Sequence, residues 1–219
     1  MENTHLPSQL TTKQTTRFFK LWLTLLKFAN DQNKIVVSIV GNDFRQQGVD
    51  HKHVDKISGY LWSHPEVFDE FLDATKFGDI DRDLVKSWQK HHYSDKFYLI
   101  KYQKDGAIFM STGKNEKSYL IKALTDSFEE MWPKNKLPLI IETTLLPFEG
   151  EITTSGIYQT SNLIFGRSIT QEINENCQKS QLTYGLIKSL PHEQVANKTD
   201  KYVAWLKFYL LSSKNMEMY

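Results

Sequence analysis

The 219-residue chain contains a single cysteine, Cys177. One thiol cannot form a disulfide within the chain, and it cannot supply the several sulfur ligands of a cysteine-rich zinc site. Ile169, Ile173 and Cys177 recur every four residues, which places the thiol on the apolar face of a predicted helix. A buried cysteine behaves as a small hydrophobic side chain. We therefore expect no catalytic thiol, and a lone cysteine agrees with a reducing compartment.

The chain also lacks an excess of charge of either sign. Its 27 basic and 26 acidic residues give a formal net charge of +1. A clear basic excess is the electrostatic footprint of proteins that bind nucleic acids or anionic membranes. The composition therefore gives no overall electrostatic case for either partner, although a local basic face remains open.

Long hydrophobic runs are missing as well. The most apolar helical candidate, residues 18–29, contains Lys20 and Lys27 and is shorter than the roughly 20 residues that span a bilayer. The first 16 residues have no apolar core after a basic start, so they do not resemble a signal peptide. We therefore expect a cytoplasmic protein with no membrane partner.

Common cofactor-binding and catalytic motifs are absent too. The spacing of Gly150, Gly156 and Gly166 matches neither a dinucleotide fingerprint nor a phosphate-binding loop. His192-Glu193 lacks the second histidine of the His-Glu-x-x-His zinc motif, and no Gly-x-Ser-x-Gly nucleophile elbow occurs. The sequence therefore predicts no cofactor and no metal.

The most strand-like part of the chain is the aliphatic and β-branched run over residues 139–146, between Pro138 and Pro147. So short a run between two prolines is typical of a buried strand. Pro147 lacks an N–H, so it should end a central strand or lie at an edge. The predicted elements that follow are a tight turn at Glu149-Gly150, a returning strand over 152–158 interrupted by Gly156, and a third strand over 163–165.

Residues 1–93 form a predicted helical region. Apolar side chains over residues 18–29 are broken only by a narrow polar stripe, which predicts a mostly buried helix. Ser63 and Glu66, with Pro65 between them, form a capping-box pattern that predicts the start of another helix. The other predicted elements are a short strand or buried segment over 34–40 and helices around 54–61, 67–72 and 84–88.

Residues 94–167 form a predicted antiparallel β region with one short helix, and residues 168–219 form predicted C-terminal helices. Asp105-Gly106 lies between two β-like runs, which is typical of a hairpin. The predicted elements are strands over 97–102, 107–112 and 119–123, a helix over 125–132 capped by Thr125 or Asp126, a helix with a capping box at Ser168 to Gln171, and an amphipathic helix carrying Tyr202, Trp205, Leu206 and Tyr209.

Together these elements predict one compact α+β unit. We expect the helical N-terminal half to pack on a small antiparallel sheet or half-open barrel, with further helices at the C-terminus.

Several segments together resemble an uncharacterised bacterial protein family. They are FFKLWLTLLKFANDQNKI, LWSHPEVFDEFLDA, DLVKSWQKHHYSDKFYLIKYQKDGAIFM and, above all, LLPFEGEITTSGI followed by NLIFG. The last pair is similar to the family's Leu-Leu-Pro-Phe-x-Gly-x-Ile-x-x-x-Gly segment and its later Phe-Gly. The resemblance covers roughly residues 15–170. Some relatives append a cysteine-rich, metal-binding tail that the single cysteine of this chain does not match, so the resemblance implies no zinc. It supports the fold and supplies no activity.

A tentative binding surface lies in the first predicted hairpin, where lysines alternate with aromatic residues. Its members are Lys101, Tyr102, Lys104 and Tyr119. Small barrels can bind single-stranded nucleic acids through aromatic platforms and basic grooves. Lysines also protect exposed sheet edges, and strand alternation can send the lysines and the aromatic rings to opposite faces. Both interpretations remain open.

A second polar cluster, His91, His92 and Asp95, lies at the predicted junction between helix and strand. A cleft there could hold a general base, although histidines at such junctions are often simply exposed. His51 and His53 belong to a His-x-His-x-Asp pattern that resembles metal hydrolases, but it falls at a helix start, where residues two apart face different ways. We predict a solvated helix start there.

The sequence favours a non-catalytic binding or regulatory module of a bacterial cytoplasmic protein. Its partner is not predicted, and both a protein and a nucleic acid remain open. Two alternatives are a hydrolase that uses a histidine and carboxylate set assembled in space, and binding of single-stranded nucleic acid by the β region.

Overall fold

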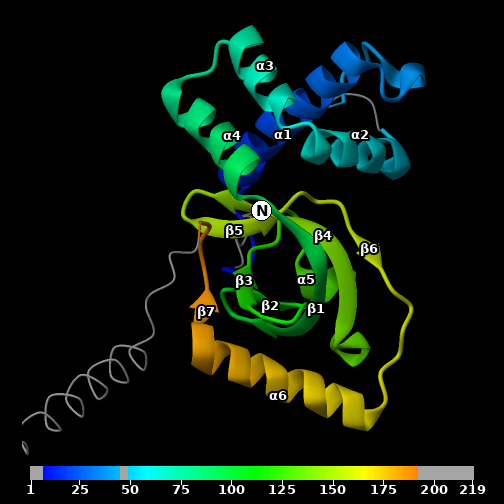
Figure 1. Cartoon of the computed structure of the whole chain (residues 1–219), viewed down its shortest axis with the longest axis vertical. Helices are drawn as coiled ribbons and strands as arrows, with labels where there is room; N and C mark the ends of the chain where they lie inside the picture. The colour runs from blue at the N-terminus through cyan, green and yellow to red at the C-terminus, as the bar shows by residue number, and fades with distance from the viewer. Residues whose placement is uncertain (1–6, 45–48, 192–219) are drawn as a thin grey trace, which may run out of the picture.

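A computed structural model describes residues 7–44 and 49–191 of the chain. Four helices form a layer at one end of a strongly curled sheet, and a fifth long helix lies along the opposite side (Figure 1). The architecture confirms the predicted α+β fold with a helical N-terminal part and a half-open barrel. The helices of the first layer are α1 (Thr12–Asn33), α2 (His51–Ser63), α3 (Glu66–Ala74) and α4 (Asp79–His91).

The helical layer has its own hydrophobic core. Helix α1 begins with a capping box in which the Thr11 hydroxyl accepts from the Gln14 backbone N–H and the Gln14 side chain accepts from the Thr11 N–H. From there its apolar face runs through the centre of the layer, as the sequence predicted. The buried α1 residues are Phe18, Leu21, Trp22, Leu25, Leu26, Ala29 and Asn30.

The sheet has the strand order β5-β4-β1-β2-β3-β7, with β6 paired to β4. All pairs are antiparallel except β3 with β7. The Lys122 N–H donates to the Ile152 carbonyl at 2.8 Å, so the chain just after β3 meets β5 and the sheet curls toward closure. The strands are β1 (Tyr93–Gln103), β2 (Gly106–Ser111), β3 (Ser118–Ile121), β4 (Leu139–Phe148), β5 (Glu151–Thr154), β6 (Gln159–Thr160) and β7 (Leu186–Ile187).

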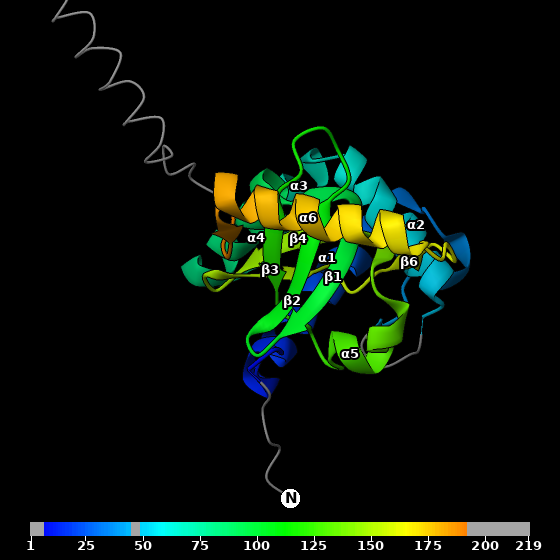
Figure 2. The ribbon, with the colours of Figure 1, turned by 90° about the horizontal axis from the view of Figure 1, so that it is seen from below.

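Short and long helices cover the two faces of this sheet. On the concave side, α5 (Phe128–Met131) inserts Phe128 among interior residues such as Phe109, and the 3-10 turn η2 (Lys134–Lys136) follows. On the convex side, α6 (Arg167–Tyr184) packs Ile173 and Cys177 against β2 (Figure 2). Cys177 is buried, as predicted.

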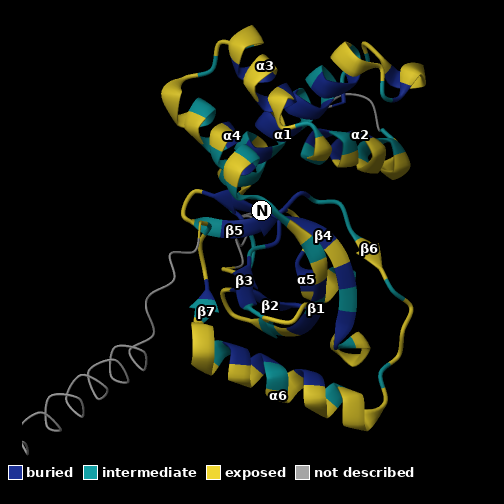
Figure 3. Ribbon diagram, in the orientation of Figure 1, coloured by how far each residue is buried: buried dark blue, intermediate teal, exposed yellow. Residues whose placement is uncertain are grey.

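The helical layer and the sheet meet around Trp88 of α4. Its indole N–H donates to the Pro147 carbonyl at 2.9 Å, and the Phe18 ring packs against both Trp88 and Phe148. The β1 partners of β4 end at Leu145, so Pro147 pairs with β5 alone and its missing N–H removes no bond from the other side. This confirms the edge position predicted for Pro147. Figure 3 shows the buried residues gathered at this junction and inside the curl.

The prediction of a strand or buried segment over residues 34–40 is wrong for most of the segment. Helix α1 ends at Lys34 in the left-handed conformation (φ 51°), and a 3-10 turn, η1 (Val37–Ile39), follows. The buried Asn30 amide accepts from the Val36 N–H at 2.7 Å and donates to its carbonyl at 3.2 Å. Because a side chain satisfies this backbone, the segment needs no neighbouring strand.

The strands predicted after β5 also differ. Strand β5 ends at Thr154, since Gly156 takes a positive φ of 77° and turns the chain. The short strand β6 pairs with β4 instead, and residues 163–165 form no strand, with Ile164 96% exposed. Aliphatic character alone does not make a strand when no neighbouring edge is free to pair.

Three predicted helix caps are wrong. Helix α5 is capped by Ser127 in a capping box with Glu130, not by Thr125 or Asp126. Ser63 donates its hydroxyl to the Gly59 carbonyl and does not cap α3, which follows Pro65. Helix α6 already begins at Arg167, so the Ser168 pattern lies inside it. The predicted helix with Tyr202, Trp205, Leu206 and Tyr209 lies outside the described residues.

Candidate ligand-binding cleft

A cleft of about 420 Å³ lies between α2 and the sheet. Four α2 residues, spaced by three and four positions, form its helical wall because such residues share one helix face. Cavities of this size, about 300 to 1,000 Å³, are typical of small-molecule sites. The α2 residues are Asp55, Ser58, Gly59 and Trp62.

The sheet wall is built from residues that lie directly opposite each other on β1 and β4. Ser94 is opposite Thr144, and their hydroxyl oxygens are 2.8 Å apart. Lys96 is opposite Glu142, and its ammonium lies 3.7 Å from the carboxylate. Direct cross-strand pairing therefore fixes one hydroxyl pair and one charged pair on this wall.

The third wall is the segment that leads from β5 into β6. The Thr143 hydroxyl donates to the Ile157 carbonyl at 2.7 Å, which holds this segment on β4. Gln159 spans the mouth of the cleft, since its amide donates to Asp55 at 3.1 Å. Asp55, Ile157 and Gln159 also line a neighbouring cavity of about 640 Å³, which His51 and Lys52 flank.

Polar groups without protein partners face this cleft. The Trp62 indole nitrogen is buried and has no hydrogen-bond partner among the described residues. Two rings stack on the indole, Trp22 at 5.4 Å and His92 at 4.4 Å between ring centroids. Ser58 and Ser155 are only 5% and 3% exposed, and their hydroxyls bond to no other described residue. An unpaired buried donor costs free energy. The Trp62 nitrogen has almost no accessible surface, so the two serine hydroxyls are the groups that a molecule in the cleft can reach.

The cleft is negatively charged. Its lining contains three carboxylates and one cation, which together give a net charge of −2. The carboxylates are Asp55, Asp95 and Glu142, and the cation is Lys96. Both Asp95 oxygens already accept hydrogen bonds, from the Tyr93 hydroxyl at 2.6 Å and from the Lys96 N–H at 2.7 Å. Burial and the neighbouring Asp95 carboxylate raise the pKa of Tyr93, so its hydroxyl stays protonated. Asp55 and Glu142, by contrast, each have an oxygen that accepts no hydrogen bond from a described residue.

The predicted cluster of His91, His92 and Asp95 contributes only Asp95 to the cleft lining. His92 instead places Nδ1 3.0 Å from the Trp88 carbonyl and stacks its ring on Trp62. Because a carbonyl only accepts, Nδ1 carries the proton in this bond. His92 thus supports Trp62 from behind, and in the described part of the chain no cluster of three histidine, cysteine or acidic residues is arranged to hold a metal.

The histidines of the His-x-His-x-Asp pattern lie at the start of α2, as predicted. Helix α2 begins at His51, and the Asp50 side chain caps it by accepting from the Lys52 N–H at 2.8 Å. His51 lines the neighbouring cavity, whereas His53 lines neither cavity. The two rings thus diverge, as helix geometry requires for residues two apart.

The tentative nucleic-acid surface is not assembled as predicted. Tyr119 is 6% exposed and packs inside the sheet, and Tyr102 is half-buried with its hydroxyl bonded to the Trp132 carbonyl. Lys101 and Lys104 are exposed. Burial raises the pKa of both tyrosines to about 12. Tyr102 follows Lys101 directly on β1 and therefore points to the other face, and both tyrosines pack with the interior cluster, so they offer no platform for bases.

Comparison of the chain with protein-family models, with curated proteins and with solved structures found no match. The cleft must therefore be interpreted from its own chemistry. Within residues 7–44 and 49–191, no helix is both long enough and apolar enough to cross a bilayer.

The α2 wall was not predicted because the periodic signal of that helix came from the adjoining apolar stripe. Val54, Ile57 and Leu61 gave the periodic signal, and Ile57 and Leu61 are indeed buried. The available clue was a second stripe of small and polar residues that ends at Trp62. A stripe of small and polar residues on a helix can face bulk solvent or line a binding site. Only the position of the sheet opposite α2 shows that this stripe lines a cleft.

Proposed function

We propose that this protein is a non-catalytic binding module that takes up a small polar ligand in the cleft between α2 and the sheet. The observation that supports the proposal is the pair of serines, Ser58 and Ser155, which are almost fully buried, line the cleft from different walls and have hydroxyls that bond to no other described residue. Several polar groups left open around one cavity are what a hydrogen-bonding ligand requires.

Binding fits the site better than catalysis does. The histidine that packs on Trp62, His92, donates from Nδ1 to a backbone carbonyl and does not line the cleft, so its ring is held as a support. Each oxygen of the Asp95 carboxylate already accepts one protein hydrogen bond. A hydrolase would need a base within reach of a bound water or hydroxyl, and these contacts favour a structural use of both groups. A bacterial source is suggested by the sequence resemblance and a cytoplasmic location by the first residues, which do not resemble a signal peptide, and both are part of the proposal.

The test uses the indole N–H signals of the full chain labelled with ¹⁵N. The five tryptophans give separate signals, and Trp62→Phe assigns the one of interest. We expect a mixture of small polar metabolites to shift the Trp62 signal, while the Trp88 signal, already bonded to Pro147, stays in place. Native mass spectrometry of protein purified gently from its own host would show the mass of the ligand.

Shifts confined to the other indoles, or no shift with any mixture and no bound mass, would overturn the proposal. A matched variant, Trp132→Phe, removes an indole outside the cleft lining and should leave the ligand response intact.

A further inference from the structure

We propose that residues 162–165 and the groove beside them form a surface through which two copies of this chain associate. These residues lead from β6 to α6 at the outer margin of the molecule (Figure 1), and most of them are exposed (Figure 3). The inference goes beyond the proposed function, because none of the residues that line this groove lines the cleft between α2 and the sheet.

The aliphatic side chains of this segment pack little against their own chain. Ile164 is 96% exposed, the highest value of any large apolar residue in the ranges that the structure describes, and Leu163 is 60% exposed. Ile169, in the first turn of α6, is 50% exposed. Single exposed apolar residues are ordinary, but three within seven positions next to a groove mark an interaction surface.

A groove of about 460 Å³ runs beside the segment. The segment forms one wall, and the start of β4 with the residues just before it forms the other. Phe165 holds its wall in place by packing on Tyr98 of β1, at 5.9 Å between ring centroids. The groove can therefore receive an apolar side chain from another molecule. Its apolar lining residues are Leu137, Pro138, Leu139, Leu163, Ile164 and Phe165.

The backbone of the segment is also unpaired. The ladder between β6 and β4 ends where the Ser161 N–H donates to the Ile140 carbonyl at 3.1 Å. Beyond that bond the chain has no turn or bend before α6, and the backbone groups of Asn162, Leu163 and Ile164 bond to no other described residue. The strand-like run predicted from the sequence thus has no partner within the chain, and its free N–H and C=O groups can pair with a strand of another molecule.

The features that normally prevent such pairing are missing. Natural edge strands are protected by charged side chains or by proline. Residues 155–166 contain neither, although 24% of the whole chain is charged. Within the described ranges β6 pairs only with β4, so its outer edge and the segment that follows are open to association.

A second copy of the chain fits this surface because the surface complements itself. Two identical segments that pair in antiparallel fashion about a two-fold axis satisfy each other's backbone, and each copy brings both an exposed isoleucine and an apolar groove. Lys136 is the one charged residue of the groove lining, and the whole chain carries a formal charge of +1, so two copies meet with little repulsion. The cores of homodimer interfaces are likewise depleted of charged residues.

The test measures the mass of the full chain by sedimentation equilibrium as its concentration rises. The patch is small for a specific interface, so we expect a dimer with a Kd of about 10 to 100 µM. Across that range the mass should rise from 25.6 kDa toward twice this value. Amide hydrogen exchange at residues 162–164 should slow in the same samples, because these N–H groups gain partners only in the dimer.

Two charged variants test the position of the interface. Ile164→Asp should weaken association at least about tenfold, because each copy would bring a carboxylate into an apolar contact beside its equivalent. Ile164→Lys should have the same effect, whereas an equimolar mixture of the two variants should associate again. The monomer should stay folded in both, since Ile164 is almost fully exposed. Ile80→Asp is the matched control, because Ile80 is 75% exposed in the first turn of α4 and does not line the groove.

A chain that keeps the mass of one copy at every concentration would overturn the inference. A dimer that Ile164→Asp leaves intact would do so too, since its interface would lie elsewhere, and so would a mixture of the two charged variants that fails to associate. If the ¹⁵N-labelled chain stays monomeric while an acidic, leucine-rich peptide shifts the amide signals of residues 162–165, the groove binds a different partner and the second copy is the wrong occupant.

Discussion

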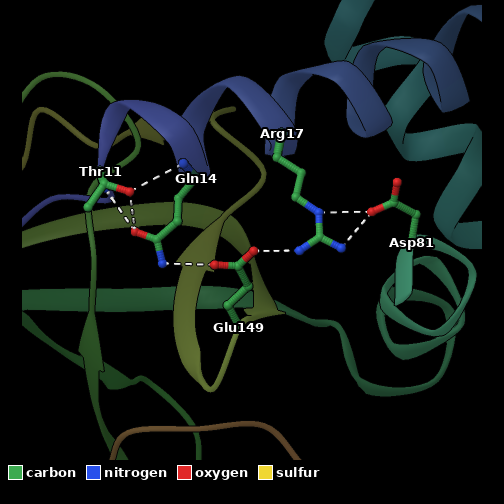
Figure 4. Close-up of polar contacts among 5 residues, drawn as sticks. All are labelled: Thr11, Gln14, Arg17, Asp81 and Glu149. Carbon is green, nitrogen blue, oxygen red and sulfur yellow. Dashed lines mark hydrogen bonds and ion pairs between the residues drawn. The ribbon is translucent and has the colours of Figure 1, made fainter. Parts of the chain in front are cut away.

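Arg17 and Glu149 join the first helix to the tip of the sheet. The guanidinium of Arg17 donates from Nη1 to Glu149 at 2.6 Å, and from Nε and Nη2 to Asp81 of α4 at 2.8 and 2.5 Å (Figure 4). Gln14 donates to the second oxygen of Glu149 at 3.0 Å while its own amide oxygen caps the helix at Thr11. One network thus fixes α1, α4 and the turn between β4 and β5.

Replacing Arg17 with methionine should lower the free energy of unfolding by about 1 to 2 kcal/mol, because two carboxylates lose a partly buried partner. Urea titration of the full chain measures the change. The matched control is Lys134→Met, whose pair with Glu129 is exposed and should change stability by less than about 0.5 kcal/mol. Equal losses for the two variants would show that the network adds nothing beyond a surface pair.

Gly106 allows β2 and β3 to approach closely. A Cβ at this position would lie 2.4 Å from the Ile121 carbonyl oxygen, and φ is +152°. Gly106→Ala should therefore destabilise the protein by about 3 kcal/mol or more, since a backbone atom cannot move aside as a side chain can. Gly113→Ala meets nothing within 4 Å and should be nearly neutral. Thermal unfolding of both variants measures the difference, and a mild Gly106→Ala variant would contradict the close approach.

Two tryptophans at the helix–sheet junction should respond differently to removal of their N–H. Trp88→Phe loses a buried hydrogen bond to Pro147 and should cost about 2 to 4 kcal/mol of unfolding free energy. Trp62→Phe loses no protein hydrogen bond, so its cost should be at least about 1 kcal/mol smaller. Chemical denaturation without added ligand compares the two. Similar costs would mean that the Trp62 N–H is satisfied in solution.

Stability should fall in alkaline solution because several tyrosines, Tyr93 among them, are harder to ionise in the folded protein. Burial raises the pKa of Tyr102, Tyr119 and Tyr158 to about 12 from the ordinary value of 10. Between these values the unfolded chain has released protons that the folded chain still holds. The free energy of unfolding therefore decreases as pH rises from about 10 to about 12.

Tyr119→Phe tests the alkaline effect. This variant keeps the buried ring and should remove about 1 to 2 kcal/mol of the loss between pH 10 and pH 12, while its stability at neutral pH changes little. Urea titrations over that pH range provide the measurement. A wild-type curve that stays flat above pH 10 would show that these hydroxyls ionise as freely in the folded state as in the unfolded chain.

Much of the fold was predictable because local rules and tertiary packing agree. Asp105-Gly106 forms the expected hairpin between β1 and β2, and Glu149-Gly150 forms the expected tight turn with φ values of 49° and 82°. The wrongly predicted elements lie where a backbone group is bonded to a side chain instead of to the partner that the local pattern predicts. At Val36, the Asn30 side-chain amide accepts the backbone hydrogen bond that a neighbouring strand would have accepted. At the start of α5, the side chain of Ser127, and not that of Asp126, accepts from the backbone of the first turn.

The candidate site was less predictable than the fold. Tyr119 looked like a surface residue beside lysines, but the curl of the sheet turned its ring inward. Trp62 looked like one more aromatic residue of a buried helix, yet its indole N–H has no protein partner and the residue lines a cleft. The direction of each ring depends on the curvature of the sheet and on how the helical layer packs against it. The periodicity of apolar residues in the sequence does not contain that information.

By itself, the sequence determined the balance of a helical first half and a strand-rich second half, the hairpin and turn positions, and the burial of Cys177. These features depend on propensities and spacings within a few residues. Only the tertiary structure decided that α2 faces β4 across a cleft, and that Asp55 and Glu142, 87 positions apart, line it together. The reason is physical: a site needs residues from separate elements, and the packing of whole faces brings those elements together.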